Sequence, residues 1–156
     1  MLEKKRLTKD QAWQKIKYFT AYQERCHQEV KDKLYSFGLY GNQVEEVIAQ
    51  LIEENYLNEE RYAAMFTGGK FRMKQWGRVK IRHALKQKRI SEYCLNKAMK
   101  AIADEDYQQA LEKLARQKWS ALSTEKNLFT KKVKALNYLL GKGYEMDLVR
   151  TVIEQL

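Results

Sequence analysis

Three stretches of this chain repeat one pattern of apolar residues, and few folds accommodate such a repeat. The stretches are VKDKLYSFGLYGNQVEEVIAQL (30–51), IRHALKQKRISEYCLNKAMKAI (81–102) and ALNYLLGKGYEMDLVRTVIEQL (135–156). In each copy, apolar residues recur at spacings of three to five on both sides of a short break; the first copy has Val30, Leu34, Leu39, Val44, Val47, Ile48 and Leu51. This spacing predicts a helix, a tight turn and a second helix in every copy.

The break in each copy contains a position that suits a left-handed backbone. Gly38, Arg89 and Gly143 correspond there. Glycine is favoured at a left-handed helix C-cap because it has no Cβ. We therefore expect the same turn in all three copies, with Arg89 holding it less easily.

A further helical segment precedes each copy, and each has a polar residue where the helix would begin. Thr8 is the predicted cap of the first, with Gln11 completing a capping box, and Asn58 is the predicted cap of the second. Asp104 or Asp106 is the predicted cap of the third.

The chain is therefore predicted to be all-α, with three tandem three-helix repeats (helix-turn-helix-like units) forming an elongated curved array. The absence of proline from the 156 residues agrees with this. The predicted boundaries are an N-terminal tail at 1–7 and repeats at 8–55, 56–103 and 104–156.

The excess of positive over negative charge lies in the second repeat. No Asp or Glu falls between Glu60 and Glu92, and the rest of the chain carries as many acidic as basic residues, so the formal net charge of +10 comes from this segment. Its basic residues are Arg61, Lys70, Arg72, Lys74, Arg78, Lys80, Arg82, Lys86, Lys88 and Arg89. One interpretation is a solvated face; the other is a surface for a polyanion or an acidic protein.

Helical spacing would place four of these cations, Arg78, Arg82, Lys86 and Arg89, on a single stripe. Ile81 and Leu85 would face the core from the same helix. The helix would thus be anchored on one face and would offer cations on another.

The stretch TGGK (67–70) resembles a phosphate-binding loop only superficially. Phe71 follows Lys70 where that motif needs Ser or Thr, and the preceding residues predict a helix rather than a strand. Two adjacent glycines in a helix cost about 2 kcal/mol relative to alanine. We expect Gly68 and Gly69 to end, bend or loosen the helix, or to mark a frayed end.

No catalytic, cofactor-binding or metal-binding constellation is predicted, and we expect no enzyme activity. The two cysteines and two histidines lack zinc-site spacing, and no nucleophile motif occurs. The tryptophans and ten tyrosines are interpreted as core or inter-repeat packing, with base stacking as the alternative. Without a signal peptide or an apolar run, we expect a cytoplasmic protein that does not enter the membrane.

Two stretches, YLNEERYAAMF (56–66) and KFRMKQWGRVKIRHALKQKRIS (70–91), resemble the RecX family, the regulatory proteins of bacterial RecA recombinase. LYSFGLYGNQVEEVIAQL and LLGKGYEMDLVRTVIEQL resemble the flanking units, so the resemblance covers about residues 8–156. The chain departs from the family at Arg89, where Gly is usual, at the Gly68–Gly69 pair, and at Cys26, where Ser is common.

The resemblance implies a non-enzymatic modulator that binds the RecA filament on single-stranded DNA and typically inhibits strand exchange, ATP hydrolysis and repressor co-cleavage. The expected partners are the RecA filament and the single-stranded DNA phosphate backbone, and we expect a monomer. This predicts a role in DNA repair, recombination and the SOS response. The alternative is an autonomous helix-turn-helix DNA-binding protein that acts independently of RecA.

Overall fold

The computed structural model describes residues 6–156, and every regular element in that range is an α-helix. Unit 1 contains α1 (Lys9–Tyr22), α2 (His27–Ser36) and α3 (Asn42–Glu53). Unit 2 contains α4 (Glu59–Lys74), α5 (Arg78–Gln87) and α6 (Glu92–Lys100). Unit 3 contains α7 (Asp104–Ala121), α8 (Leu128–Gly141) and α9 (Met146–Glu154). The all-α prediction with three tandem three-helix repeats is confirmed.

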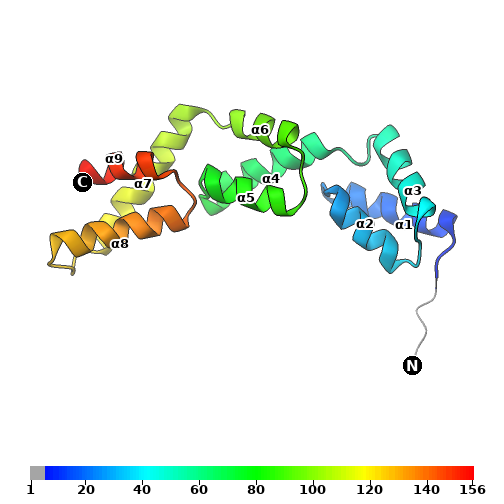
Figure 1. Cartoon of the computed structure of the whole chain (residues 1–156), viewed down its shortest axis with the longest axis horizontal. Coiled ribbons are helices and arrows are strands. Elements are labelled where there is room, and N and C mark those ends of the chain that lie inside the picture. Colours follow the sequence, from blue (N-terminus) through cyan, green and yellow to red (C-terminus); the bar gives the residue numbers. More distant parts are fainter. Residues whose placement is uncertain (1–5) are drawn as a thin grey trace, which may run out of the picture.

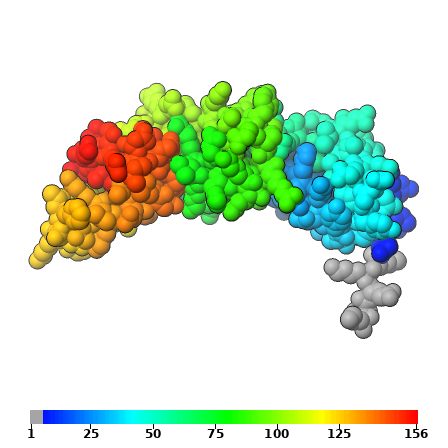
Figure 2. Space-filling model, in the orientation of Figure 1, coloured from blue at the N-terminus to red at the C-terminus, as the bar shows by residue number. Residues whose placement is uncertain are grey.

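The three units follow one another along an arch (Figure 1). The helices α2, α5 and α8, which correspond in the repeat, lie along its concave edge, and α6 lies along its convex edge. The space-filling view shows the same curvature, with unit 2 at the centre (Figure 2). The predicted elongated, curved array is confirmed.

Each unit has its own hydrophobic cluster. The corresponding residues Val30, Ile81 and Ala135 are all fully buried. The other apolar repeat positions are buried too, except that Leu156 is half-buried. The repeat read from the sequence is therefore the core pattern of the fold.

The predicted left-handed turn occurs in every unit. The φ angle is 90° at Gly38, 60° at Arg89 and 99° at Gly143. Arg89 thus adopts a conformation that costs a residue with a side chain about 1–2 kcal/mol. The contacts of its neighbours hold it there, because Ile90, the next residue, is buried in the core of unit 2.

Two of the three predicted helix caps are confirmed. Thr8 and Gln11 form a capping box, and the Asn58 side chain accepts a hydrogen bond from the Arg61 N–H. The third prediction is wrong, because α7 begins at Asp104 and its N-cap is Ala103. The acidic residues lie in the first turn, where they stabilise the helix through its dipole rather than by capping.

The expected helix end at Gly68–Gly69 is wrong, because α4 continues through both glycines to Lys74; a bend or loosening there stays a prediction. Thr67 is buried, and Phe71 packs against the clusters of units 2 and 3. Burying an aromatic side chain contributes about 1.5–3 kcal/mol, which offsets the low helix propensity of the two glycines.

Unit 2 is joined to unit 3 through main-chain atoms. The N–H of Gly77 donates to the carbonyl of Lys142 (2.8 Å), and the N–H of Val79 donates to that of Gly143 (2.9 Å). A Cβ on Gly77 would lie 2.4 Å from the carbonyl carbon of Gly143, so only glycine permits this approach. The carbonyls at the end of α8 thus satisfy N–H groups at the start of α5, with the two helix dipoles head to tail.

Unit 1 is joined to unit 2 through side chains. Cys26, the N-cap of α2, corresponds to Gly77 in the repeat, but its N–H bonds with Glu29 in its own unit. Within residues 6–156, no main-chain hydrogen bond joins the helices of these two units; in the link between them, the N–H groups of Tyr56 and Leu57 donate to the carbonyl of Leu51. Arg61 forms an ion pair with Glu24 instead, and the Cys26 side chain is buried in the cluster of unit 2.

Residues 1–5 of the predicted N-terminal tail lie outside the described residues. The N–H of Leu7 donates to the carbonyl of Phe37 (2.9 Å), and the Leu7 side chain packs on the core of unit 1. None of the described helices has the length and apolar character that a membrane span requires.

Candidate interaction surface

The basic segment lies on α4, on α5 and on the turn after α5. Its cations differ in exposure. Four are exposed, namely Arg72, Lys74, Lys86 and Arg89. Six are half-buried, namely Arg61, Lys70, Arg78, Lys80, Arg82 and Lys88. We call these ten residues the basic surface.

Three of the ten cations form ion pairs within the chain, and two of these, Arg61 and Arg78, pair with residues of a neighbouring unit. Arg61 pairs with Glu24 and also bonds with Asn55 (3.1 Å to Oδ1). Arg78 pairs with Asp104 (2.8 Å) and Glu145 (3.2 Å). Both arginines therefore have a structural role at a joint between units. Their acidic partners lie outside the segment that lacks Asp and Glu, so the sequence of that segment did not indicate the ion pairs.

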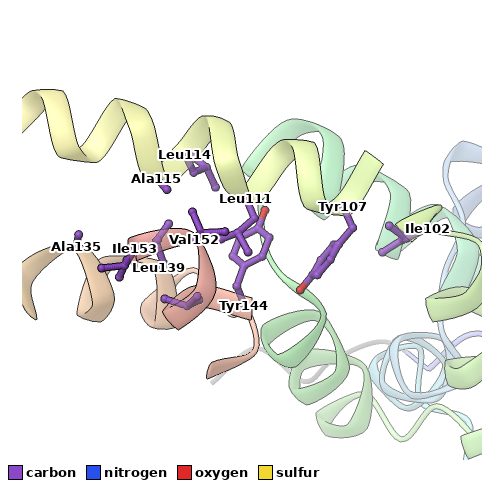
Figure 3. Close-up of a cluster of buried hydrophobic side chains, with 11 residues drawn as sticks. Ile102, Tyr107, Leu111, Leu114, Ala115, Ala135, Leu139, Tyr144, Val152 and Ile153 are labelled. Atoms are coloured by element: carbon purple, nitrogen blue, oxygen red, sulfur yellow. The ribbon is translucent and has the colours of Figure 1, made fainter. Parts of the chain in front are cut away.

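Arg78 is part of a partly buried network around Tyr107. The hydroxyl of Tyr107 accepts from the N–H of Arg78 (2.9 Å) and donates to the carboxylate of Glu145. Figure 3 shows this hydroxyl directed away from the core of unit 3, toward the segment that enters α5. Burial, together with the bond to Glu145, raises the pKa of Tyr107 above its ordinary value. The network fixes the first turn of α5, and hence the direction of its cations.

The predicted single stripe of four cations is wrong at one position. The helix α5 ends at Gln87, and Arg89 lies in the turn with a positive φ. Since the chain leaves helical geometry before it, Arg89 does not continue the stripe. Arg78, Arg82 and Lys86 remain on one face of α5, as predicted.

This face of α5 borders a cleft of 510 Å³, lined by Arg78, Val79, Arg82, His83, Lys86 and Glu145. Arg82 bonds with Asn96 (3.1 Å), an uncharged partner, so its charge is not neutralised there. Lys86 is exposed and lies 3.8 Å from Glu92, which is also exposed. An exposed pair of this kind contributes little and is readily exchanged for another partner. Among the cations that line this cleft, Arg82 and Lys86 are thus the best placed to attract an anion.

Three other lysines of the basic surface, Lys70, Lys80 and Lys88, lie over aromatic rings. Lys70 and Lys80 lie over the ring of Trp76, at 4.8 and 4.6 Å from its centre. Lys70 also lies over Phe66, as does Lys88. Trp76 is half-buried and packs against the cluster of unit 2, so the expected packing role holds for its buried part.

The fold and this surface define an elongated helical-repeat protein with a basic central unit. Two family models match it: the second three-helix domain of RecX at residues 58–99, and the third three-helix domain of RecX at residues 104–153. The chain belongs to the RecX family of regulatory proteins.

Individual relatives agree with this assignment. The regulatory protein RecX of Clostridium perfringens strain 13 is 33% identical over 133 residues, which are 85% of this chain and 62% of that protein. The regulatory protein RecX of Salmonella paratyphi A is 34% identical over 108 residues, 69% of this chain and 63% of that protein. The chain thus spans about three fifths of the length of these relatives.

Two crystal structures share the fold. RecX from Lactobacillus salivarius superposes with a TM-score of 0.86 at 24% identity, covering 95% of this chain and 96% of the other. A second structure, of regulatory protein RecX, superposes with a TM-score of 0.84 at 20% identity, covering 94% and 71%. At these identities the likeness concerns the fold alone.

Proposed function

We propose that this chain is a non-enzymatic regulator that binds the filament formed by RecA on single-stranded DNA and lowers its activity, with a role in DNA repair, recombination and SOS control. The observation that carries the proposal is membership of the RecX family together with a basic surface at the centre of the arch. An elongated arch suits contact with more than one subunit of a filament, and its cations attract acidic protein surface and DNA phosphates alike.

The proposal favours α5 as the contacting helix. In a helix-turn-helix protein that reads DNA, the second helix of the motif enters the major groove. Here that helix is α6, which packs along α4, and its Lys97 pairs with Glu60 (2.6 Å). The first helix, α5, instead carries Arg82, whose partner is the uncharged Asn96, and Lys86, whose pair with Glu92 is exposed. This arrangement favours a filament regulator over the autonomous DNA-binding protein.

The test is RecA ATP hydrolysis on single-stranded DNA, with the chain added at far less than one molecule per RecA. The wild-type chain is expected to lower the rate strongly. The variant Arg82→Glu/Lys86→Glu is expected to lose this effect, because it reverses the two best-placed cations. Arg78 is left unchanged, since its ion pairs hold units 2 and 3 together.

The matched control is Lys113→Glu/Arg116→Glu, which makes the same charge change at two exposed positions of α7. It should inhibit as the wild-type chain does, and far-UV circular dichroism should show that both variants are folded. Equal inhibition by the α5 variant and the control would reject the basic surface as the contact. No effect of the wild-type chain on RecA would reject the proposed function.

A further inference from the structure

A second cleft lies within unit 1, between α1 and α2, and the basic surface does not include it. Its volume is 720 Å³, compared with 510 Å³ for the cleft on α5. Four aromatic residues line it, namely Tyr18, Phe19, Tyr22 and Phe37. The charged residues in its lining are all cations, namely Lys15, Arg25 and Lys33. It therefore combines flat apolar surface with positive charge.

The two tyrosines are available to a partner. The side chains of Tyr18 and Tyr22 are 74% and 71% exposed, although they are large and aromatic. They are one helical turn apart on α1, so they project from the same face. Their ring centres are 6.3 Å apart and the ring planes are inclined by 31°. Neither ring is needed for the core of unit 1, whose members lie on the opposite face of α1.

The two phenylalanines hold the cations in place. The guanidinium of Arg25 lies 3.7 Å from the centre of the Phe19 ring. The ammonium of Lys33 lies over both Phe19 and Phe37, at 5.5 and 5.6 Å. Lys15 lies over Phe37 at 6.0 Å. Cation–π contacts of this kind orient the positive groups while leaving their charge available to an anion.

We propose that this cleft binds single-stranded nucleic acid, with bases stacking on Tyr18 and Tyr22 and phosphates contacting Lys15 and Lys33. Exposed aromatic rings beside a basic groove are the combination that binds single strands without regard to sequence. Duplex DNA fits less well, because its bases are stacked on one another and do not reach the rings. A free nucleotide fits less well too, because an open cleft has no converging set of buried polar groups to orient it.

A third cleft lies at the joint between units 1 and 2, and Phe66, Lys70 and Lys88 line it together with two carboxylates, Glu24 and Glu29. Glu29 also pairs with Arg25 of the unit 1 cleft (3.7 Å). The proposed site is therefore confined to the unit 1 cleft, where the charged lining is wholly cationic. The proposed site does not rest on any action on RecA, and it is tested with naked nucleic acid.

The experiment is fluorescence anisotropy with three labelled probes of equal length: oligothymidylate, an abasic strand with the same phosphates, and a blunt duplex. The wild-type chain is expected to bind oligothymidylate more tightly than either other probe. Tyr18→Ala/Tyr22→Ala should bind oligothymidylate about tenfold more weakly and the abasic strand as before. Tyr18→Phe/Tyr22→Phe should retain wild-type binding, because stacking needs the ring and not the hydroxyl.

The matched control is Tyr93→Ala, which removes an exposed tyrosine (68%) from α6. It should bind all three probes as the wild-type chain does. The salt dependence of oligothymidylate binding should be unchanged in the tyrosine double variant, since no phosphate contact is removed. Unchanged oligothymidylate affinity in Tyr18→Ala/Tyr22→Ala would overturn the proposal and assign these rings to a protein contact. Equal affinity of the wild-type chain for the abasic strand would overturn it as well.

Discussion

Replacing Gly77 with alanine should separate units 2 and 3, although alanine suits the backbone at that position. The φ and ψ angles of Gly77 are −80° and 169°, which any residue adopts. On that ground alone, Gly77→Ala would stabilise the chain by about 0.4–1 kcal/mol, through lower entropy of the unfolded state. The new Cβ, however, would lie 2.4 Å from the carbonyl carbon and oxygen of Gly143, and both atoms belong to the backbone.

The clash is expected to decide the outcome. Carbon atoms in good contact are about 3.5–4.0 Å apart, so the joint must open by about 1 Å. The hydrogen bonds from Gly77 to Lys142, from Val79 to Gly143 and from Arg78 to Tyr107 would then lengthen or break. At about 0.5–1.5 kcal/mol each, their loss exceeds the entropic gain, and the net decrease in unfolding free energy should be about 2–3 kcal/mol.

The assay is urea unfolding followed by far-UV circular dichroism and by tryptophan fluorescence. Gly77→Ala should lower the midpoint, and the two signals should separate if units 2 and 3 unfold independently. The matched control is Gly69→Ala, because a Cβ there meets nothing within 4 Å. It should raise the stability by about 0.5–1 kcal/mol, as expected for glycine within a helix. A Gly77→Ala chain as stable as the control would refute the close-approach argument.

Two further substitutions test other features of the fold. Arg89→Gly should raise the unfolding free energy by about 1 kcal/mol in the same urea assay, because glycine adopts the positive φ without strain; a lower stability would mean that the Arg89 side chain makes a net favourable contact. Tyr107 has a raised pKa in the folded chain, so its contribution is complete below pH 10 and is lost as the pH rises further. Between pH 10 and 11, the wild-type stability should therefore fall more steeply than that of Tyr107→Phe, by up to about 1.4 kcal/mol per pH unit. Parallel pH dependences of the two chains would show that Tyr107 ionises as easily in the folded chain as in the unfolded chain.

The sequence predicted the features that depend on local pattern. Apolar spacing identified the three cores. The break after the second helix of each unit identified the left-handed turns at Gly38, Arg89 and Gly143. The expected helix end at Gly68–Gly69 was wrong because helix propensity is a weak preference that packing overrides, here through Thr67 and Phe71.

The sequence could not show which cations are free. The partners of Arg61 and Arg78 come from other units, and nothing in the local pattern indicates that Glu24 or Glu145 will lie beside them. The aromatic cleft of unit 1 was missed for a similar reason. Tyr18 and Tyr22 are at helical spacing, which is also the spacing of core residues, and only the fold shows which face of α1 is covered.

The two joints also differ in how readily substitutions can change the angle between the units, and hence the curvature of the arch. Between units 2 and 3, main-chain hydrogen bonds at Gly77 and Gly143 act together with the ion pairs of Arg78 and the hydroxyl of Tyr107, so several contacts fix the angle at once. Between units 1 and 2 the contact depends on the Arg61–Glu24 pair and on Cys26, so single substitutions can change the angle. During divergence, the curvature of the arch can therefore be adjusted at the first joint while the second keeps the basic unit fixed against unit 3.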